Sequence, residues 1–198
     1  MRLGSPAPTA ESAPIGAPSE LRYARFVTSH RLFRTTVSGE IRFKSRMFSN
    51  VWVMTGTDGV IARMQRIPST HTSRATLGDG TRLEIKPEGW GTVIAAGDSQ
   101  KAKIVRESWW GRRWAVSGTG FSYDLTSDPM PRRWTLRIGG HPVARIAGTL
   151  WSYNRMIVQA DVAVPIHALI LSWHVLARPW EAAAAPGSLR PKRPPALR

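Results

Sequence analysis

The segment from Pro165 to Arg178 constrains the fold more than any other part of the chain. It reads PIHALILSWHVLAR and is followed by Pro179, so prolines bound an apolar helix of about thirteen residues. Apolar side chains surround this helix almost completely, which is typical of a helix buried on all sides. A bilayer span needs about twenty apolar residues, and this segment contains two histidines. We therefore expect the helix to pack inside a protein core, and we expect no transmembrane span.

The residues before this helix predict strands. Polar and apolar residues alternate over 82–86, 121–126 and 133–138, as in strands with one buried face. Weaker strand patterns occur at 51–54, 60–67, 92–96, 101–105, 112–117, 143–147 and 155–160. Dipeptides that suit hairpin turns separate several of them, namely Asp58-Gly59, Asp79-Gly80 and Gly139-Gly140. The expected fold class is mainly β, a closed antiparallel β-barrel of about 10–12 strands that encloses helix 165–178, because closure removes exposed strand edges.

Composition divides the chain into a leader, one domain and a tail. Residues 1–20 are rich in Pro, Ala and Ser, and 181–198 are basic and rich in Pro, so both predict disorder. Residues 21–180 are expected to form a single domain. The chain has no Cys, which excludes disulfides and thiolate metal sites and fits a reducing compartment. We expect a cytoplasmic location, with peripheral attachment to the inner membrane face as a further option.

Positive charge is the strongest bias in the composition. The net charge is +15, and 23 of the 28 basic residues are Arg. A domain this basic suits a polyanionic partner, and the planar guanidinium group contacts phosphate oxygens at two points. The candidate anion-binding residues lie on expected strands or in two Arg-Arg-Trp triplets: Arg112, Arg113, Arg132, Arg133, Arg137, Lys101 and Lys103. The alternative is a solvated basic face without a specific ligand.

Strand 133–138 shows how the direction of these side chains is predicted. Successive residues on a strand face opposite ways, so Arg133 and Arg137 should point outward if Trp134, Leu136 and Ile138 point into the core.

The Trp109-Trp110 pair is the second candidate feature. One of two adjacent strand residues should be exposed unless a turn or a bulge intervenes, and an exposed Trp beside Arg112 suits a membrane interface or a stacked base. The alternative is that one Trp fills the core while the other covers a neighbouring strand.

Signatures of catalysis and of metal binding are missing from the sequence. There is no nucleophile elbow, phosphate-binding loop or zinc-helix motif, so we predict no catalytic residues, no metal site and no cofactor. His167 and His174 lie seven residues apart on the expected helix, whereas zinc ligands on a helix usually lie four apart, so we interpret both as core residues. The chemistry predicted is therefore binding.

A series of weak motifs, taken in order, resembles a known family. The motifs are Val51-Trp52-Val53-Met54 with Asp58 to Arg63, Trp114 to Gly118 with Tyr123-Asp124-Leu125, Leu136 to Gly140 with Val143 to Ile146, and Met156-Ile157-Val158 leading through Asp161 to the helix. This order is similar to the tubby C-terminal-like superfamily, which includes the tubby domain, the LURP-one-related proteins and the phospholipid scramblases.

The resemblance implies a binding module, with phosphoinositides as the ligand in tubby proteins and bilayer phospholipids as the proposed substrate in scramblases. Asp161 stands alone before the helix, without the acidic cluster proposed to bind calcium in scramblases. We therefore expect docking to an anionic phospholipid surface through the basic residues. The alternatives are a nucleic-acid-binding protein that uses the same Arg and Trp surface, and an intracellular protein-interaction domain. The oligomeric state stays open.

Overall fold

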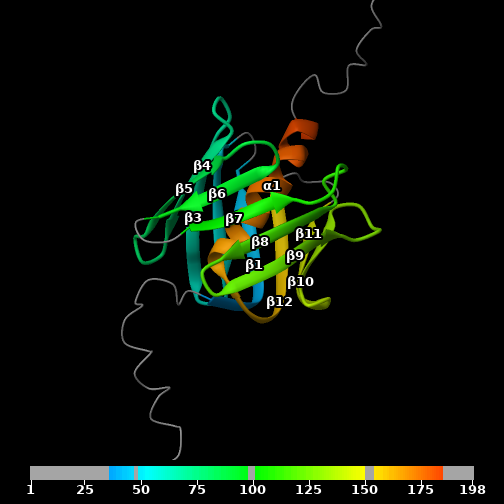
Figure 1. The fold of residues 1–198 in the computed structure, drawn as a ribbon. Coiled ribbons are helices and arrows are strands. Elements are labelled where there is room, and N and C mark those ends of the chain that lie inside the picture. Colours follow the sequence, from blue (N-terminus) through cyan, green and yellow to red (C-terminus); the bar gives the residue numbers. More distant parts are fainter. Residues whose placement is uncertain (1–35, 47–48, 98–100, 150–153, 185–198) are drawn as a thin grey trace, which may run out of the picture. The chain divides into compact units, whose positions relative to one another are not determined.

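The structure is a computed structural model that describes residues 36–46, 49–97, 101–149 and 154–184, with side chains in the last segment through Ala177. These residues form twelve strands and one helix (Figure 1). The elements are β1 Thr36–Ser45, β2 Val51–Gly56, β3 Gly59–Ile67, β4 Thr72–Leu77, β5 Arg82–Pro87, β6 Thr92–Ala96, β7 Lys101–Arg106, β8 Arg113–Gly118, β9 Phe121–Ser127, β10 Arg133–Ile138, β11 His141–Gly148, β12 Arg155–Pro165 and α1 Ile166–Ala184. The predicted leader and residues 185–198 of the predicted tail lie outside the described residues.

The strands form a closed antiparallel barrel, as predicted. Each strand pairs with the next one in sequence, and β1 closes the ring by pairing with β12. The register between β1 and β12 shifts between Val37 and Gly39, where Gly39 adopts a positive φ of 77°. A backbone in this region suits Gly because it lacks a Cβ. Closure pairs the edges of all twelve strands, so the sheet offers no open edge to a partner.

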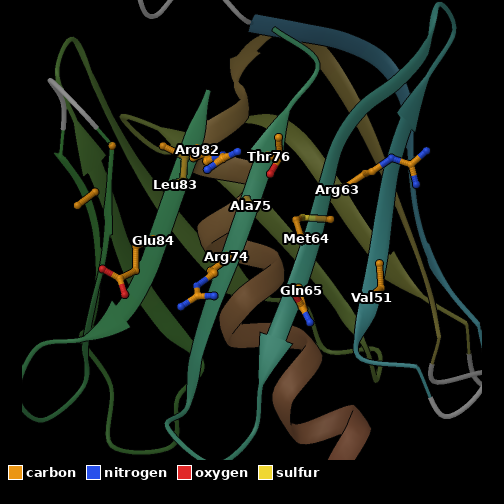
Figure 2. A pocket seen from close by; sticks show the side chains of 12 residues that line it. Val51, Arg63, Met64, Gln65, Arg74, Ala75, Thr76, Arg82, Leu83 and Glu84 are labelled. Carbon is orange, nitrogen blue, oxygen red and sulfur yellow. The ribbon is translucent and has the colours of Figure 1, made fainter. Parts of the chain in front are cut away.

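Helix α1 occupies the interior of the barrel. Every residue from Ile166 to Ala177 is buried, which requires protein on all sides of the helix. The helix contacts β6, β7, β8 and β12, and Trp173 packs edge-on against Trp52 of β2 with ring centroids 6.0 Å apart. Figure 2 shows the helix behind β3, β4 and β5. Within the described part of the chain, no helix has the length and apolarity needed to cross a membrane.

Two polar contacts fix how the helix sits in the barrel. His174 is fully buried, and its Nδ1 lies 2.9 Å from the Oγ of Ser73 on β4. Arg66 on β3 is also buried, and its guanidinium carbon lies 5.9 Å from the centre of the Trp173 ring. His167 is buried as well, so the prediction that both histidines belong to the core is confirmed.

The prediction for the helix boundaries was wrong at both ends. Pro165 is the last residue of β12, and the helix continues past Arg178 and Pro179 to Ala184. It therefore takes in residues 181–184, which the sequence assigned to a disordered tail. Proline inside a helix removes one N–H and costs about 3 kcal/mol. The rule that proline ends a helix, which set the predicted boundary, therefore does not hold at Pro179.

Because neighbouring strands run in opposite directions, successive connections lie alternately at the two ends of the barrel. The connections after odd-numbered strands meet at one end, here called the loop end, and those after even-numbered strands meet at the other, here called the hairpin end. The helix follows β12 from the hairpin end and runs back toward the loop end. At the hairpin end, three of the connections are two-residue turns at 57–58, 119–120 and 139–140.

Candidate functional site

The structure brings four of the seven predicted basic residues together at the loop end. These are Arg112 and Arg113, where the β7–β8 loop enters β8, and Arg132 and Arg133, where the β9–β10 loop enters β10. The backbone N–H of Ser127 on β9 donates to the carbonyl of Arg112 (2.9 Å), and Ser127 pairs with Trp134 beside Arg133. The two arginine pairs are thus two strand spacings, about 10 Å, apart. We call these four residues the loop-end arginines.

These side chains differ in how tightly they are held. Arg113 forms an exposed ion pair with Glu107, with Nη2 3.6 Å from Oε2. Arg132 has a positive φ of 58° and donates from Nη1 to the carbonyl of Thr149. Arg112 and Arg133 are exposed, and neither forms an ion pair with a described carboxylate. Both are thus accessible to an anionic ligand.

The other three predicted residues do not join this group. Lys101 and Lys103 are exposed but lie on β7, which starts at the hairpin end. Arg137 lies near the hairpin end of β10, where its Nη1 donates to the carbonyl of Gly140 (2.9 Å). Its Nε also lies 3.4 Å from the Oγ1 of Thr126. Arg137 therefore bonds within its own sheet and hairpin.

The predicted side-chain directions on β10 hold for its first part only. Leu136 is fully buried, and Trp134 packs against the core. The prediction that Ile138 points inward was wrong, because Ile138 is 47% exposed. The pairing of β10 with β11 shifts between Leu136 and Arg137. The extra residue of this bulge is the buried Val143 of β11, so the strand that bends is β11 and not β10. Ile138 is the last residue of β10, beside the Gly139-Gly140 turn, and it is exposed because it lies at the end of the barrel.

Trp109 and Trp110 both point into solvent, with exposed fractions of 74% and 82%. The interpretation that one of them fills the core was wrong. They are the central residues of a β-turn, in which the N–H of Gly111 donates to the carbonyl of Ser108 (2.9 Å). Gly111 has a positive φ of 65°, a conformation that Gly adopts at little cost.

Hydrogen bonds hold this turn in place. The Oγ of Ser108 accepts from the backbone N–H groups of Arg112 (2.8 Å) and Arg113 (2.9 Å). Arg106 donates from Nε to the carbonyl of Ser108 (3.0 Å) and from Nη2 to the carbonyl of Trp109. The loop therefore presents its two Trp side chains from a bonded backbone.

Trp90 and Met130 extend the exposed apolar surface, and sequence reasoning missed both. Trp90 lies in the β5–β6 loop, is 72% exposed, and packs against Trp109 with ring centroids 5.9 Å apart. The guanidinium carbon of Arg106 lies 5.5 Å from the centre of the Trp90 ring. Met130 lies in the β9–β10 loop and is 56% exposed. We call Trp90, Trp109, Trp110 and Met130 the apolar rim.

The sequence around Trp90 and Met130 does indicate that both are exposed. Trp90 stands between Gly89 and Gly91, and Met130 stands between Pro129 and Pro131. Residues between glycines or prolines lie in turns, where a large apolar side chain has little chance of reaching the core.

A second basic surface lies on the outer wall of the barrel. A shallow hollow of about 730 Å³ over β2 to β6 is lined by Arg63, Arg74, Arg82, Thr76 and Glu84, among others (Figure 2). Figure 2 shows that Arg82 extends toward Thr76 while Arg63 extends the opposite way, toward β2. The guanidinium groups of Arg63 and Arg82 therefore do not converge on one point over the hollow.

Comparisons with known proteins add little to this description. No protein-family model matches the chain, and no curated protein sequence matches it significantly. The chain is similar to the X-ray structure of a protein from Arabidopsis thaliana, with a TM-score of 0.49 and 12% sequence identity. That similarity covers 74% of this chain and 94% of the other.

Proposed function

We propose that the protein is a non-catalytic module that docks on membrane surfaces rich in anionic phospholipids. The observation that carries the proposal is the gathering of the four loop-end arginines on two neighbouring connections of the barrel. Guanidinium groups at one end of a rigid barrel can contact several phosphates of one surface at the same time.

The strength of such docking follows from the local charge. Residues 88–91, 106–113 and 128–133 contain five Arg and three carboxylates, a net charge of +2. Each basic residue near an anionic bilayer contributes about 1 kcal/mol, and an exposed partner such as Glu107 reduces that value for Arg113. We expect reversible docking that weakens as salt is added, because the charges are exposed.

The family resemblance suggests which kind of lipid-binding module this is and which lipids it prefers. A barrel that contains a C-terminal apolar helix is similar to the tubby C-terminal-like fold, and we infer a lipid-binding module of that kind at the inner face of a membrane. Phosphoinositide headgroups carry more negative charge than other phospholipids and would be the preferred ligands. No bound metal or cofactor is part of the proposal.

The test is sedimentation with vesicles of phosphatidylcholine alone and of phosphatidylcholine with phosphatidylserine, across a salt series. The variant Arg112→Gln/Arg113→Gln/Arg133→Gln removes three charges from the loop end. Its matched control, Arg82→Gln/Lys101→Gln/Lys103→Gln, removes three exposed charges elsewhere on the barrel. We expect affinity for the anionic vesicles to fall about 30- to 100-fold in the first variant and much less in the control. Equal losses would show that net charge alone drives the binding.

Nucleic-acid binding is the second candidate, because the exposed Trp110 lies two residues from Arg112 and bases stack on such rings. A short DNA duplex and a single strand should therefore be added as competitors. Preference for either over anionic vesicles at physiological salt would replace the lipid proposal.

A further inference from the structure

We propose that the apolar rim inserts into the interfacial layer of the bilayer, so that the barrel stands on the membrane with its loop end down. This inference rests on the proposed docking to anionic phospholipids. It adds the orientation of the barrel on the membrane, the depth to which its loops enter the bilayer, and a binding role for the uncharged residues of the apolar rim. The docked partner is a lipid bilayer, which takes up apolar side chains at the level of its headgroups.

The distribution of exposed apolar side chains is the first observation. Trp110, Trp109, Trp90 and Met130 are the four most exposed large apolar residues of the described chain, at 82%, 74%, 72% and 56%. All four lie on three successive loop-end connections, β5–β6, β7–β8 and β9–β10. Exposed apolar groups gathered in this way mark an interaction surface, whereas scattered ones do not.

The chemistry of these side chains favours the headgroup layer. Trp has a large apolar ring and one N–H donor, and it is enriched where membranes meet water. Only Gly111 separates Trp110 from Arg112 and Arg113 in the sequence. Insertion of the Trp rings would therefore bring two guanidinium groups to the level of the lipid phosphates.

The rim is ordered before any ligand arrives. The β-turn of Ser108 and Gly111 holds two of its Trp residues, and the contact between Trp90 and Trp109 links two loops. Arg106 lies over the Trp90 ring and bonds the Trp109 carbonyl. The Trp90 and Trp109 side chains therefore lose little freedom on binding. Because Trp109 and Arg106 already pack against Trp90, this ring suits insertion better than stacking on a base.

Among the residues that the structure describes, the opposite end of the barrel carries no comparable surface. Its described two-residue turns are Thr57-Asp58, Thr119-Gly120 and Gly139-Gly140. Its exposed apolar residues, such as Val60 and Ile138, are aliphatic and lie next to different turns. The two ends therefore differ in chemistry, which predicts one preferred orientation on a bilayer.

The chain has no Cys, so an introduced Cys carries a spin label at a unique position. We would label Trp110→Cys and Met130→Cys at the rim, and Thr57→Cys at the hairpin end as the matched control. Vesicles of phosphatidylcholine with phosphatidylserine are the probe. On binding, we expect the two rim labels to lose access to a water-soluble relaxing agent and to gain access to oxygen. The label at position 57 should not change.

The outcomes separate this inference from the docking proposal. Protein that sediments with the vesicles while both rim labels stay accessible to water overturns the inference and leaves docking intact. Protein that fails to sediment overturns both.

A second measurement uses Trp109→Ser/Trp110→Ser. This variant removes the contact between Trp109 and Trp90 but no buried side chain, so the thermal unfolding temperature should change little. We expect its affinity for the same vesicles to fall about 10- to 100-fold with the salt dependence retained. An unchanged affinity would contradict insertion.

Discussion

Replacement of His167 should change how the stability of the barrel depends on pH. His167 lies in the first turn of α1 and is only 4% exposed. Burial lowers its pKa from 6.5 to about 4, and the nearby Asp79 carboxylate opposes this change. The folded barrel therefore holds His167 in its neutral form at pH values where the unfolded chain is already protonated.

The sign and size of the effect follow from linkage. As the pH falls below 6.5, the unfolded chain takes up a proton on His167 and the folded chain does not, so the free energy of unfolding decreases. The decrease reaches at most about 1.4 kcal/mol per pH unit and ends near pH 4, where the folded protein is protonated too. A fall from 6.5 to about 4 corresponds to about 3 kcal/mol in total. Above pH 6.5 this contribution is fully present.

The assay measures the free energy of unfolding in urea for the wild type and for His167→Gln. The pH is lowered from 7.5 to 4 in steps of about 0.5. At each pH, the free energy of unfolding of the variant is subtracted from that of the wild type, so that the effect of carboxylates present in both proteins cancels. We expect the wild type to lose about 3 kcal/mol relative to the variant across this range. A difference that does not vary with pH would refute the reasoning. In Asp79→Asn, loss of the opposing charge should lower the pKa further and extend the decline to lower pH.

Three further substitutions test packing and the Trp loop. Ser73→Ala removes the contact with His174, so the free energy of unfolding should fall by about 1–3 kcal/mol; an unchanged urea midpoint would show that the contact contributes nothing. Gly118→Ala would place a Cβ 2.5 Å from the Phe121 ring, which should cost about 1–3 kcal/mol in the same assay, and a stability equal to the wild type would mean that the ring moves aside freely. Ser108→Ala removes the acceptor of two backbone N–H groups in the Trp loop. Vesicle affinity should fall several-fold while global unfolding changes by about 1 kcal/mol or less, and a large loss of stability with full affinity would contradict this role.

Alternation of polar and apolar residues predicted most of the barrel, and its failures have physical causes. Strand β4 was missed because its buried residues are Ser73, Ala75 and Leu77, a pattern with little apolar contrast. Small side chains are needed there because His174 of the enclosed helix approaches Ser73. Strand β1 was also missed, although Ile41 and Phe43 alternate with charged residues. This alternation is typical of a strand with one buried face, so local pattern is sufficient to predict β1.

The candidate site was harder to predict because its residues meet through loops and not along strands. Strand parity assigned faces to Arg133 and Arg137 but could not tell that they lie toward opposite ends of β10. It could not place Trp109 and Trp110, because the residues of a β-turn do not alternate between faces. The contact between Trp90 and Trp109 joins loops nineteen residues apart in sequence, a separation that no local pattern encodes.

The enclosed helix also restricts where this fold can bind a ligand. With α1 inside the barrel, a ligand in the interior would have to displace buried side chains such as Leu169 and Trp173. Closure of the sheet removes edge pairing as a means of recognition. Binding is then left to the outer wall and the two ends. On the wall, Arg63 and Arg82 extend in opposite directions, and three of the connections at the hairpin end are two-residue turns. The loop end combines longer connections, exposed Trp residues and accessible guanidinium groups, so a loss of binding confined to loop-end variants is the result that this architecture predicts.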